Sequence, residues 1–142
     1  MRSLERFGDV SDVIFRVLFS LIFLFGGLGH FGNKEALQAG LESAPNAYLA
    51  TAIASPELLM SLSGVALLVG GLALAAGFQA RWAALGLFLV LLAITVTVHI
   101  GNSGPHIVHV FKNTALLGGL IHFFVRGAGA YSIDARMNRT AG

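Results

Sequence analysis

Long runs of apolar residues set the strongest limit on how this chain can fold. Four segments, at 13–31, 56–77, 82–100 and 106–125, hold at most one charged side chain each. Each is close to the roughly 20 residues that an α-helix needs to cross the hydrocarbon core of a bilayer. Only 11% of the 142 residues are charged and 56% are hydrophobic, whereas soluble domains carry about 25% charged residues. The sequence therefore predicts an all-α membrane protein with four transmembrane helices, in one domain over residues 1–142.

The connections between these spans predict an antiparallel four-helix bundle. The short loop at 78–81 makes the second and third spans antiparallel neighbours. Basic residues concentrate on the side that holds both termini, and the other side offers only Lys34 and Lys112. By the positive-inside rule we expect both termini to be cytoplasmic, and residues 99–113 to face outward, toward the periplasm if the host is Gram-negative. Apolar residues at helical spacing in KEALQAGLES (34–43) predict a short amphipathic helix in the first outer loop, and we expect the polar tail 126–142 to be partly disordered.

The composition excludes whole classes of function. The net charge is only +2 and the basic residues are scattered, so the chain has no nucleic-acid-binding surface. It contains no cysteine, which rules out disulfides, thiolate metal sites and iron-sulfur clusters within the chain. Redox chemistry here therefore requires a bound cofactor or a partner protein.

The two halves of the chain are similar to one another in sequence. The first span ends in His-Phe-Gly-Asn (30–33) and the third in His-Ile-Gly-Asn (99–102), while the second and fourth contain ALLVGG (66–71) and ALLGG (115–119). This pattern predicts a parallel repeat of two helical hairpins, related by an axis along the membrane normal. The two histidine-bearing ends should then lie at the same depth on the same side.

Polar side chains gather at the predicted outer end, above all in HIGNSGPHIVHVFKN (99–113). A polar group at membrane depth is costly, and it is by default a hypothesis of function. The candidate ligand-binding residues are His30, Asn33, Glu57, His99, Asn102, Lys112 and Asn113. Glu57 and Lys112 can pair across the bundle, or each can simply cap its helix, a glutamate being favourable at a helix N-terminus.

The remaining ionisable residues of the spans have more than one interpretation. His106 and His109 share a helix face with Asn113, and imidazoles can ligate zinc or copper, ligate haem iron or hydrogen-bond a quinone carbonyl. The alternative is that they are interfacial residues in contact with water. Arg16 lies near the cytoplasmic side, where it either reaches lipid phosphate or has a separate functional role. His122 is on the opposite face of the fourth span and is structural or lipid-facing.

The order of motifs resembles the DoxX family of small bacterial four-helix membrane proteins, related to the small subunit of thiosulfate:quinone oxidoreductase and to MauE. The motifs are Arg16, GGLGHFGN (26–33), Glu57, ARWAA (80–84), His99 and Lys112-Asn113 with ALLGG. The segment GAGAYSID (127–134) is similar to the family's Gly-Pro-Gly-aromatic-Ser-hydrophobic-Asp, but it lacks the proline and has one residue more. The resemblance covers nearly the whole chain and implies the four-helix fold. It also implies a polar pocket lined by His30, Glu57 and His99, and a link to sulfur and thiol redox enzymes and quinones.

Three functions are consistent with these residues. The first is an accessory subunit of a membrane redox system that binds a quinone at the outer ends of the helices, with Asn33, Asn102 and Asn113 orienting it. The second is a structural or assembly subunit that contacts a larger membrane complex through its third or fourth span, and the third is a metal or proton pathway. The expected partners are membrane lipid, other membrane or soluble oxidoreductase subunits and a second copy of the chain. No residue is singled out as catalytic.

Overall fold

The computed structural model describes residues 2–140, with side chains from residue 7 onward, and within this range it contains no β-strand. Its helices are α1 (Arg2–Gly32), α2 (Lys34–Glu42), α3 (Ala47–Thr51), α4 (Pro56–Ala76), α5 (Ala80–Ile94), the π-helix η1 (Thr95–His99), α6 (His106–Arg126) and α7 (Ile133–Thr140). Four helical segments are long and apolar enough to cross a membrane: α1, α4, α5 continued by η1, and α6. The predicted all-α transmembrane fold is therefore confirmed.

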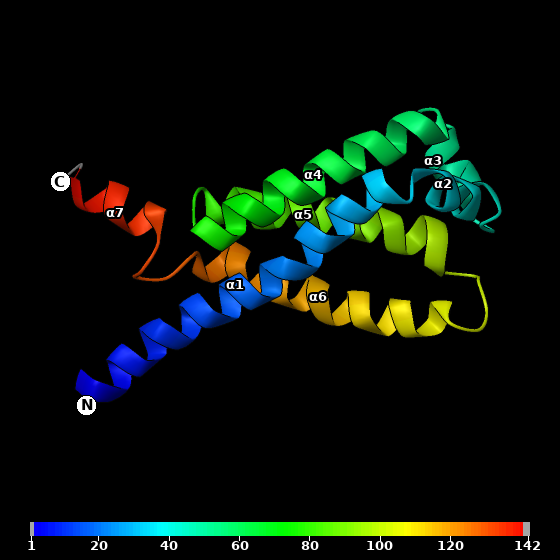
Figure 1. Ribbon diagram of the computed structural model, residues 1–142. Helices are drawn as coiled ribbons and strands as arrows, with labels where there is room; N and C mark the ends of the chain where they lie inside the picture. Colours follow the sequence, from blue (N-terminus) through cyan, green and yellow to red (C-terminus); the bar gives the residue numbers. More distant parts are fainter. Residues whose placement is uncertain (1, 141–142) are drawn as a thin grey trace.

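Both chain termini lie at one end of the bundle (Figure 1). We call this the terminal end; it holds the start of α1, the turn between α4 and α5, the end of α6 and helix α7. The opposite end, with the end of α1, helices α2 and α3, η1 and the start of α6, is the histidine end. Helix α1 packs along α4, α4 packs on α5, and α5 packs on α6. The closest pairs are α1 with α4 and α5 with α6, which are the two hairpins of the predicted repeat.

The core lies in the middle of the helix bundle. Leu74 of α4, Leu87 of α5 and Leu120 of α6 are fully enclosed. Helix α1 reaches α6 through aromatic rings, because Phe15 stacks on Phe123 of α6 with ring centroids 5.1 Å apart. Lipid gives helices no hydrophobic reason to associate, so this close packing provides the contact energy that holds the bundle together.

Glycines allow α1 and α4 to approach closely. A Cβ atom on Gly64 of α4 would lie 2.9 Å from the Cβ of His30, and one on Gly27 of α1 would lie 3.0 Å from the Gly64 carbonyl oxygen. Both positions are buried. The backbones can therefore meet only where no side chain separates them, as in other small-residue helix crossings in membranes.

The first loop is folded over the histidine end. The predicted amphipathic helix at 34–43 is present as α2, Lys34–Glu42. Its Leu41 is only 2% exposed, so the apolar side of α2 faces the bundle. The second short helix of this loop, α3, was not predicted from the sequence. Together α2 and α3 lie across the ends of α4 and η1.

The polar tail is folded rather than disordered, so that expectation is wrong for residues up to 140. Helix α7 is fastened to the α4–α5 turn through Asp134, whose carboxylate accepts hydrogen bonds from the backbone N–H groups of Gln79 (2.7 Å) and Ala80 (2.9 Å). The Asp134 backbone N–H donates to the Gly77 carbonyl at 2.9 Å. The first N–H groups of a helix have no partner within it, so an aspartate that is distant in sequence supplies the cap that α5 needs. Residues 141 and 142 lie outside the described range.

Arg16 neither extends to lipid phosphate nor faces an open site. Its side chain is only 2% exposed, and its guanidinium donates to the carbonyl oxygens of Ala75 (3.2 Å), Ala128 and Tyr131 (2.9 Å). These acceptors belong to the last turn of α4 and to the segment after α6. Arg16 therefore joins three parts of the chain at the terminal end, and its role in the fold is structural.

Gly77 makes this junction possible. Its backbone has φ of +67°, a left-handed conformation that ends α4 and is costly for residues with a side chain. A Cβ atom there would also lie 2.5 Å from the Ser132 Cβ and 3.0 Å from the Arg16 Cζ. Both the turn and the close approach of the tail therefore require glycine at this position.

We expect Arg16→Met to lower the free energy of unfolding by about 3 kcal/mol, because three carbonyl oxygens, one buried and two partly buried, lose a charged donor. The measurement is unfolding in mixed micelles of increasing sodium dodecyl sulfate content. The control is Lys34→Met, which removes a partly exposed ion pair with Glu57 and should cost less than about 1 kcal/mol. Equal, small effects of both changes would show that Arg16 is solvated.

Alanine substitutions on α1 test the glycine contact. Gly27→Ala should lower the free energy of unfolding by about 1–3 kcal/mol, because the added methyl group overpacks the crossing with α4. The matched control is Gly29→Ala on the same helix, where an added Cβ would meet no atom within 4 Å. That change should be neutral or slightly stabilising, since alanine favours helix. The same unfolding assay compares the two variants, and equal destabilisation would contradict a close crossing of α1 and α4 at Gly27.

Candidate functional site

The histidine end is shaped by a local change in helix geometry. At Thr95–His99 helix α5 widens into the π-helix η1. The hydroxyl groups of Thr95 and Thr97 donate back to the carbonyl oxygens of Leu91 (2.6 Å) and Ala93 (2.7 Å), an interaction that often bends helices. Single π turns inside α-helices occur frequently at functional sites. This one places His99 at the end of the third span, against helix α6.

Three imidazole rings and an ammonium group meet there. The Nδ1 atoms of His99 and His106 are 3.1 Å apart, and the His99 ring stacks on that of His109 with centroids 4.9 Å apart. The Lys112 Nζ lies 3.4 Å from the His109 Nδ1. We call these four residues the histidine cluster. The three histidines are half-buried and Lys112 is exposed, so the cluster is open to a ligand at the surface of the bundle.

A buried polar pair lies beneath the cluster. Asn113 and Thr95 are only 2% and 4% exposed, and the Asn113 side-chain amide donates to the Thr95 hydroxyl at 2.9 Å. This bond joins α6 to η1 one turn below the histidines. Asn113 was expected to orient a ligand, but the structure engages its amide nitrogen in fixing the two helices that carry the cluster.

The structure separates His30 from the other predicted site residues. Its Nδ1 lies 2.8 Å from the Gly26 carbonyl oxygen on its own helix, and its Cβ packs against Gly64 of α4. No hydrogen bond or ring contact between described residues links His30 to the histidine cluster. The predicted pocket shared by His30, Glu57 and His99 is therefore divided, with His99 on the α6 side and His30 on the α4 side.

Glu57 pairs with Lys34 and not with Lys112. The Lys34 Nζ lies 2.8 Å from the Glu57 Oε1, and the glutamate side chain is 71% exposed. Glu57 is in the first turn of α4 and Lys34 begins α2, so the fold of the first loop brings them together. The interpretation of Glu57 as a residue at a helix N-terminus fits this position, and the pairing across the bundle does not occur.

The predicted asparagines Asn33 and Asn102 do not meet in a common pocket. Asn102 donates to the Val98 carbonyl oxygen at 2.7 Å, and Asn33 is exposed at the start of α2 without a side-chain capping bond. Asn46 was not singled out from the sequence. Its side-chain amide donates to the carbonyl oxygens of Val96 (3.1 Å) and Ile100 (2.8 Å), which fastens the first loop to η1. Nothing local in the sequence indicates this contact, because its partners lie about 50 residues away.

The histidine cluster has a limited capacity for metal. Within residues 7–140, no group of three or more His, Asp or Glu side chains is arranged to hold an ion. The rings of His106 and His109 are edge to face with centroids 6.3 Å apart. The metal site predicted at these two histidines therefore lacks the set of three protein ligands that zinc sites use as a minimum.

An apolar cavity of about 600 Å³ lies beside η1, on a different face from the cluster. It is bounded by α4, α5 and the first loop, and η1 contributes Val96, Thr97 and Val98 but not His99. No residue of α6 lines it. The cavity and the histidine cluster are therefore two separate features of the histidine end.

Comparison with known proteins agrees with this architecture. The sequence model of the DoxX family matches residues 11–100. The chain belongs to the DoxX family. The inner membrane protein YqjF of Escherichia coli (strain K12) is 27% identical over 138 residues, which are 96% of this chain and 98% of that protein. No solved structure matches the chain at a significant level. With its four apolar helices, this DoxX-family chain is a multi-pass inner membrane protein.

Valine substitutions test the buried pair beneath the cluster. Thr95→Val should lower the free energy of unfolding by about 1–3 kcal/mol, because it leaves the buried Asn113 amide without its acceptor. The control is Thr97→Val, whose hydroxyl bonds only to the backbone of its own helix and should matter by less than about 1 kcal/mol. Unfolding in sodium dodecyl sulfate micelles measures both. If the two variants are equally stable, the bond between Asn113 and Thr95 does not hold the helices in register.

Proposed function

We propose that this DoxX-family protein is an accessory subunit of a membrane redox system, and that its histidine cluster binds the head group of a quinone. The observation that carries the proposal is the contact among three imidazoles at the end of a transmembrane hairpin. Polar groups at this depth are rarely retained without a function. The cluster is also half-buried rather than fully hydrated, so a ligand can displace water from it.

The chemistry of the cluster suits a ligand that accepts hydrogen bonds. With two Nδ1 atoms 3.1 Å apart, one of the His99 and His106 rings donates a proton and the other accepts it. The ion pair found among the described side chains holds Glu57 with Lys34, so no carboxylate neutralises Lys112 at this cluster. The site therefore presents hydrogen-bond donors and a positive charge to a carbonyl oxygen.

Reduction of a quinone to a quinol requires two electrons and two protons. Histidine is the side chain that most readily exchanges protons near neutral pH, so His99 and His106 can relay protons from water to the two oxygens, each ring taking up a proton at one nitrogen as it gives one up from the other. Lys112 offsets negative charge on the oxygen before it is protonated. The electrons come from a partner oxidoreductase subunit, because the chain has no cysteine and brings no redox group of its own among its side chains.

We also propose that the histidine end faces the periplasm. The exposed arginines Arg81, Arg126, Arg136 and Arg139 are at the terminal end, and the histidine end has only the lysines Lys34 and Lys112. By the positive-inside rule, the side with the excess of basic residues faces the cytoplasm, and here that side is the terminal end. The quinone head group would then lie at the outer surface of the inner membrane.

The test of the redox proposal is quinone binding by the double variant His99→Gln and His106→Gln. The probe is decylubiquinone, added to the full chain in neutral nanodiscs and quantified by native mass spectrometry. We expect binding to weaken about tenfold or more, since losing about 1.4 kcal/mol of hydrogen bonding changes affinity by that factor. The control is His122→Gln, an exposed histidine of α6 that lies against Phe15.

Unchanged binding in the double variant, or equal loss in the His122 variant, contradicts the proposed site. Co-purification tests the alternative, in which the chain is a purely structural subunit. If the wild type binds no quinone but co-purifies stoichiometrically with an oxidoreductase that holds all the cofactors, the chain is an assembly subunit and the histidine cluster belongs to its contact surface.

A further inference from the structure

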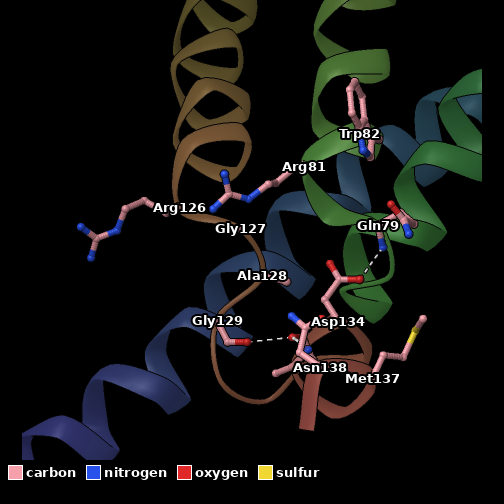
Figure 2. Close-up of a pocket in the computed structure, with 12 residues that line it drawn as sticks. Gln79, Arg81, Trp82, Arg126, Gly127, Ala128, Gly129, Asp134, Met137 and Asn138 are labelled. Carbon is pink, nitrogen blue, oxygen red and sulfur yellow. Dashed lines mark hydrogen bonds between the residues drawn. The ribbon is translucent and has the colours of Figure 1, made fainter. Parts of the chain in front are cut away.

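A second cavity, which is polar, lies at the terminal end and has no part in the function proposed above. It has a volume of about 460 Å³ and lies between the start of α5, the end of α6 and helix α7. Figure 2 shows its lining, which includes Gln79, Arg81, Trp82, Gly127, Asp134 and Asn138. The cavity is formed by the same junction that Arg16 and Asp134 hold together.

Two arginines flank the turn at Gly127. Figure 2 shows Arg81 reaching from α5 toward Gly127, while Arg126 extends from the end of α6 beyond the turn. A Cβ atom on Gly127 would lie 3.6 Å from the Arg81 Nε, so that guanidinium lies directly against the backbone of the turn. The ion pair among the described side chains is at the histidine end. Among the side chains that the structure describes, no carboxylate therefore lies within ion-pair distance of Arg81 or Arg126.

The carboxylate in the cavity is already engaged. Both Asp134 oxygens accept backbone N–H groups at the start of α5, where the positive end of the helix dipole also offsets the negative charge. Among the charged groups, the Arg81 guanidinium is therefore the one left free toward a ligand, while Arg126, whose side chain extends away from Arg81 (Figure 2), adds positive charge at the edge of the cavity. Their excess of positive charge favours an anion over a neutral or zwitterionic molecule.

The cavity lies at the depth of the lipid head groups. Arg81 and Trp82 are at the start of the span Ala80–His99, and Arg126 is the last residue of the span His106–Arg126. Trp82 is 67% exposed, and exposed tryptophans next to span ends characteristically lie among the head groups. A ligand that enters this cavity from the membrane therefore brings its phosphate to the arginines and its chains to the tryptophan.

We propose that this cavity binds the phosphate of an anionic phospholipid. Arg81 provides a forked, two-bond contact to the phosphate oxygens, and Arg126 adds a second cation from the other side of Gly127. Basic pockets between transmembrane helices bind lipid head groups in this way. The site is independent of the histidine cluster, so either proposal can fail without the other.

The test uses the full chain, stripped of lipid in a neutral detergent and titrated with dioleoylphosphatidylglycerol or dioleoylphosphatidylcholine. Lipid retained by the protein is measured by native mass spectrometry. We expect the anionic lipid to bind at least tenfold more tightly than the zwitterionic one. The double variant Arg81→Gln and Arg126→Gln should reduce this preference to about twofold or less. The matched control is Arg136→Gln with Arg139→Gln, which removes the same charge from α7 outside this cavity and should leave the preference within twofold of the wild type.

Three results overturn the proposal. The first is equal binding of the two lipids by the wild type, and the second is an equal loss of lipid preference in the two double variants. The third is retention of inorganic phosphate, added at millimolar concentration, as strong as that of the anionic lipid. The last result identifies a soluble phosphate as the ligand. A further variant covers the case in which the glutamine variant does not fold. Arg81→Lys keeps the charge but cannot form the forked contact, so it should bind the anionic lipid several-fold more weakly than the wild type, and full affinity in this variant contradicts the role of Arg81.

Discussion

The terminal end of this protein depends on the hydrogen bonds that the buried guanidinium of Arg16 donates to backbone carbonyl groups. A cation within a bundle surrounded by hydrocarbon is stable only where protein groups replace its hydration, and Arg16 obtains this from carbonyl oxygens of Ala75, Ala128 and Tyr131. Ala75 is in the last turn of α4, where helical carbonyl groups have no partner within the helix. One side chain therefore satisfies its own donors and the acceptors of a helix end and a loop. It also holds the segment after α6 in place, so that Asp134 can cap α5.

The two ends of the bundle use their polar groups differently. At the terminal end the two polar groups that hold the fold together bind backbone: the Arg16 guanidinium binds carbonyl groups, and the Asp134 carboxylate binds N–H groups. At the histidine end, by contrast, the rings of His99, His106 and His109 contact one another. Side chains that contact only each other can exchange those contacts for a ligand without unfolding a helix end. This difference is a physical reason to expect ligand exchange at the histidine cluster, and to expect stability of the fold from Arg16 and Asp134.

The sequence predicted the helices well and their side-chain partners poorly. Span positions follow from hydropathy and bilayer thickness, and α2 follows from helical periodicity, because both signals are local. Partner choice is not local. Lys34 lies near Glu57 because α2 folds back over the start of α4, and Asp134 reaches Gln79 across 55 residues of sequence. The polar tail had the composition of a disordered segment, and its distant contacts with Arg16 and with the start of α5 explain why it is ordered. Proximity was predicted for His30 as well as for the histidines within 99–113. It is found only within 99–113, where short spacing limits the geometry, and the His30 ring binds its own helix.

The predicted internal repeat lets the histidine ends of the two hairpins be compared position by position. Aligning Gly70-Gly71 with Gly118-Gly119 puts Leu58, Ser61 and Gly64 of α4 at the positions of His106, His109 and Lys112 of α6. In the first hairpin, Gly64 lets α1 approach so closely that His30 packs against bare backbone and turns its ring to its own helix. In the second hairpin, long polar side chains occupy the equivalent positions and η1 widens the third span beside them. The same depth in the membrane thus gives a closed contact in one half and a polar cluster in the other. A site at this end of the bundle is therefore expected to belong to the α5–α6 hairpin, with the α1–α4 hairpin as its support.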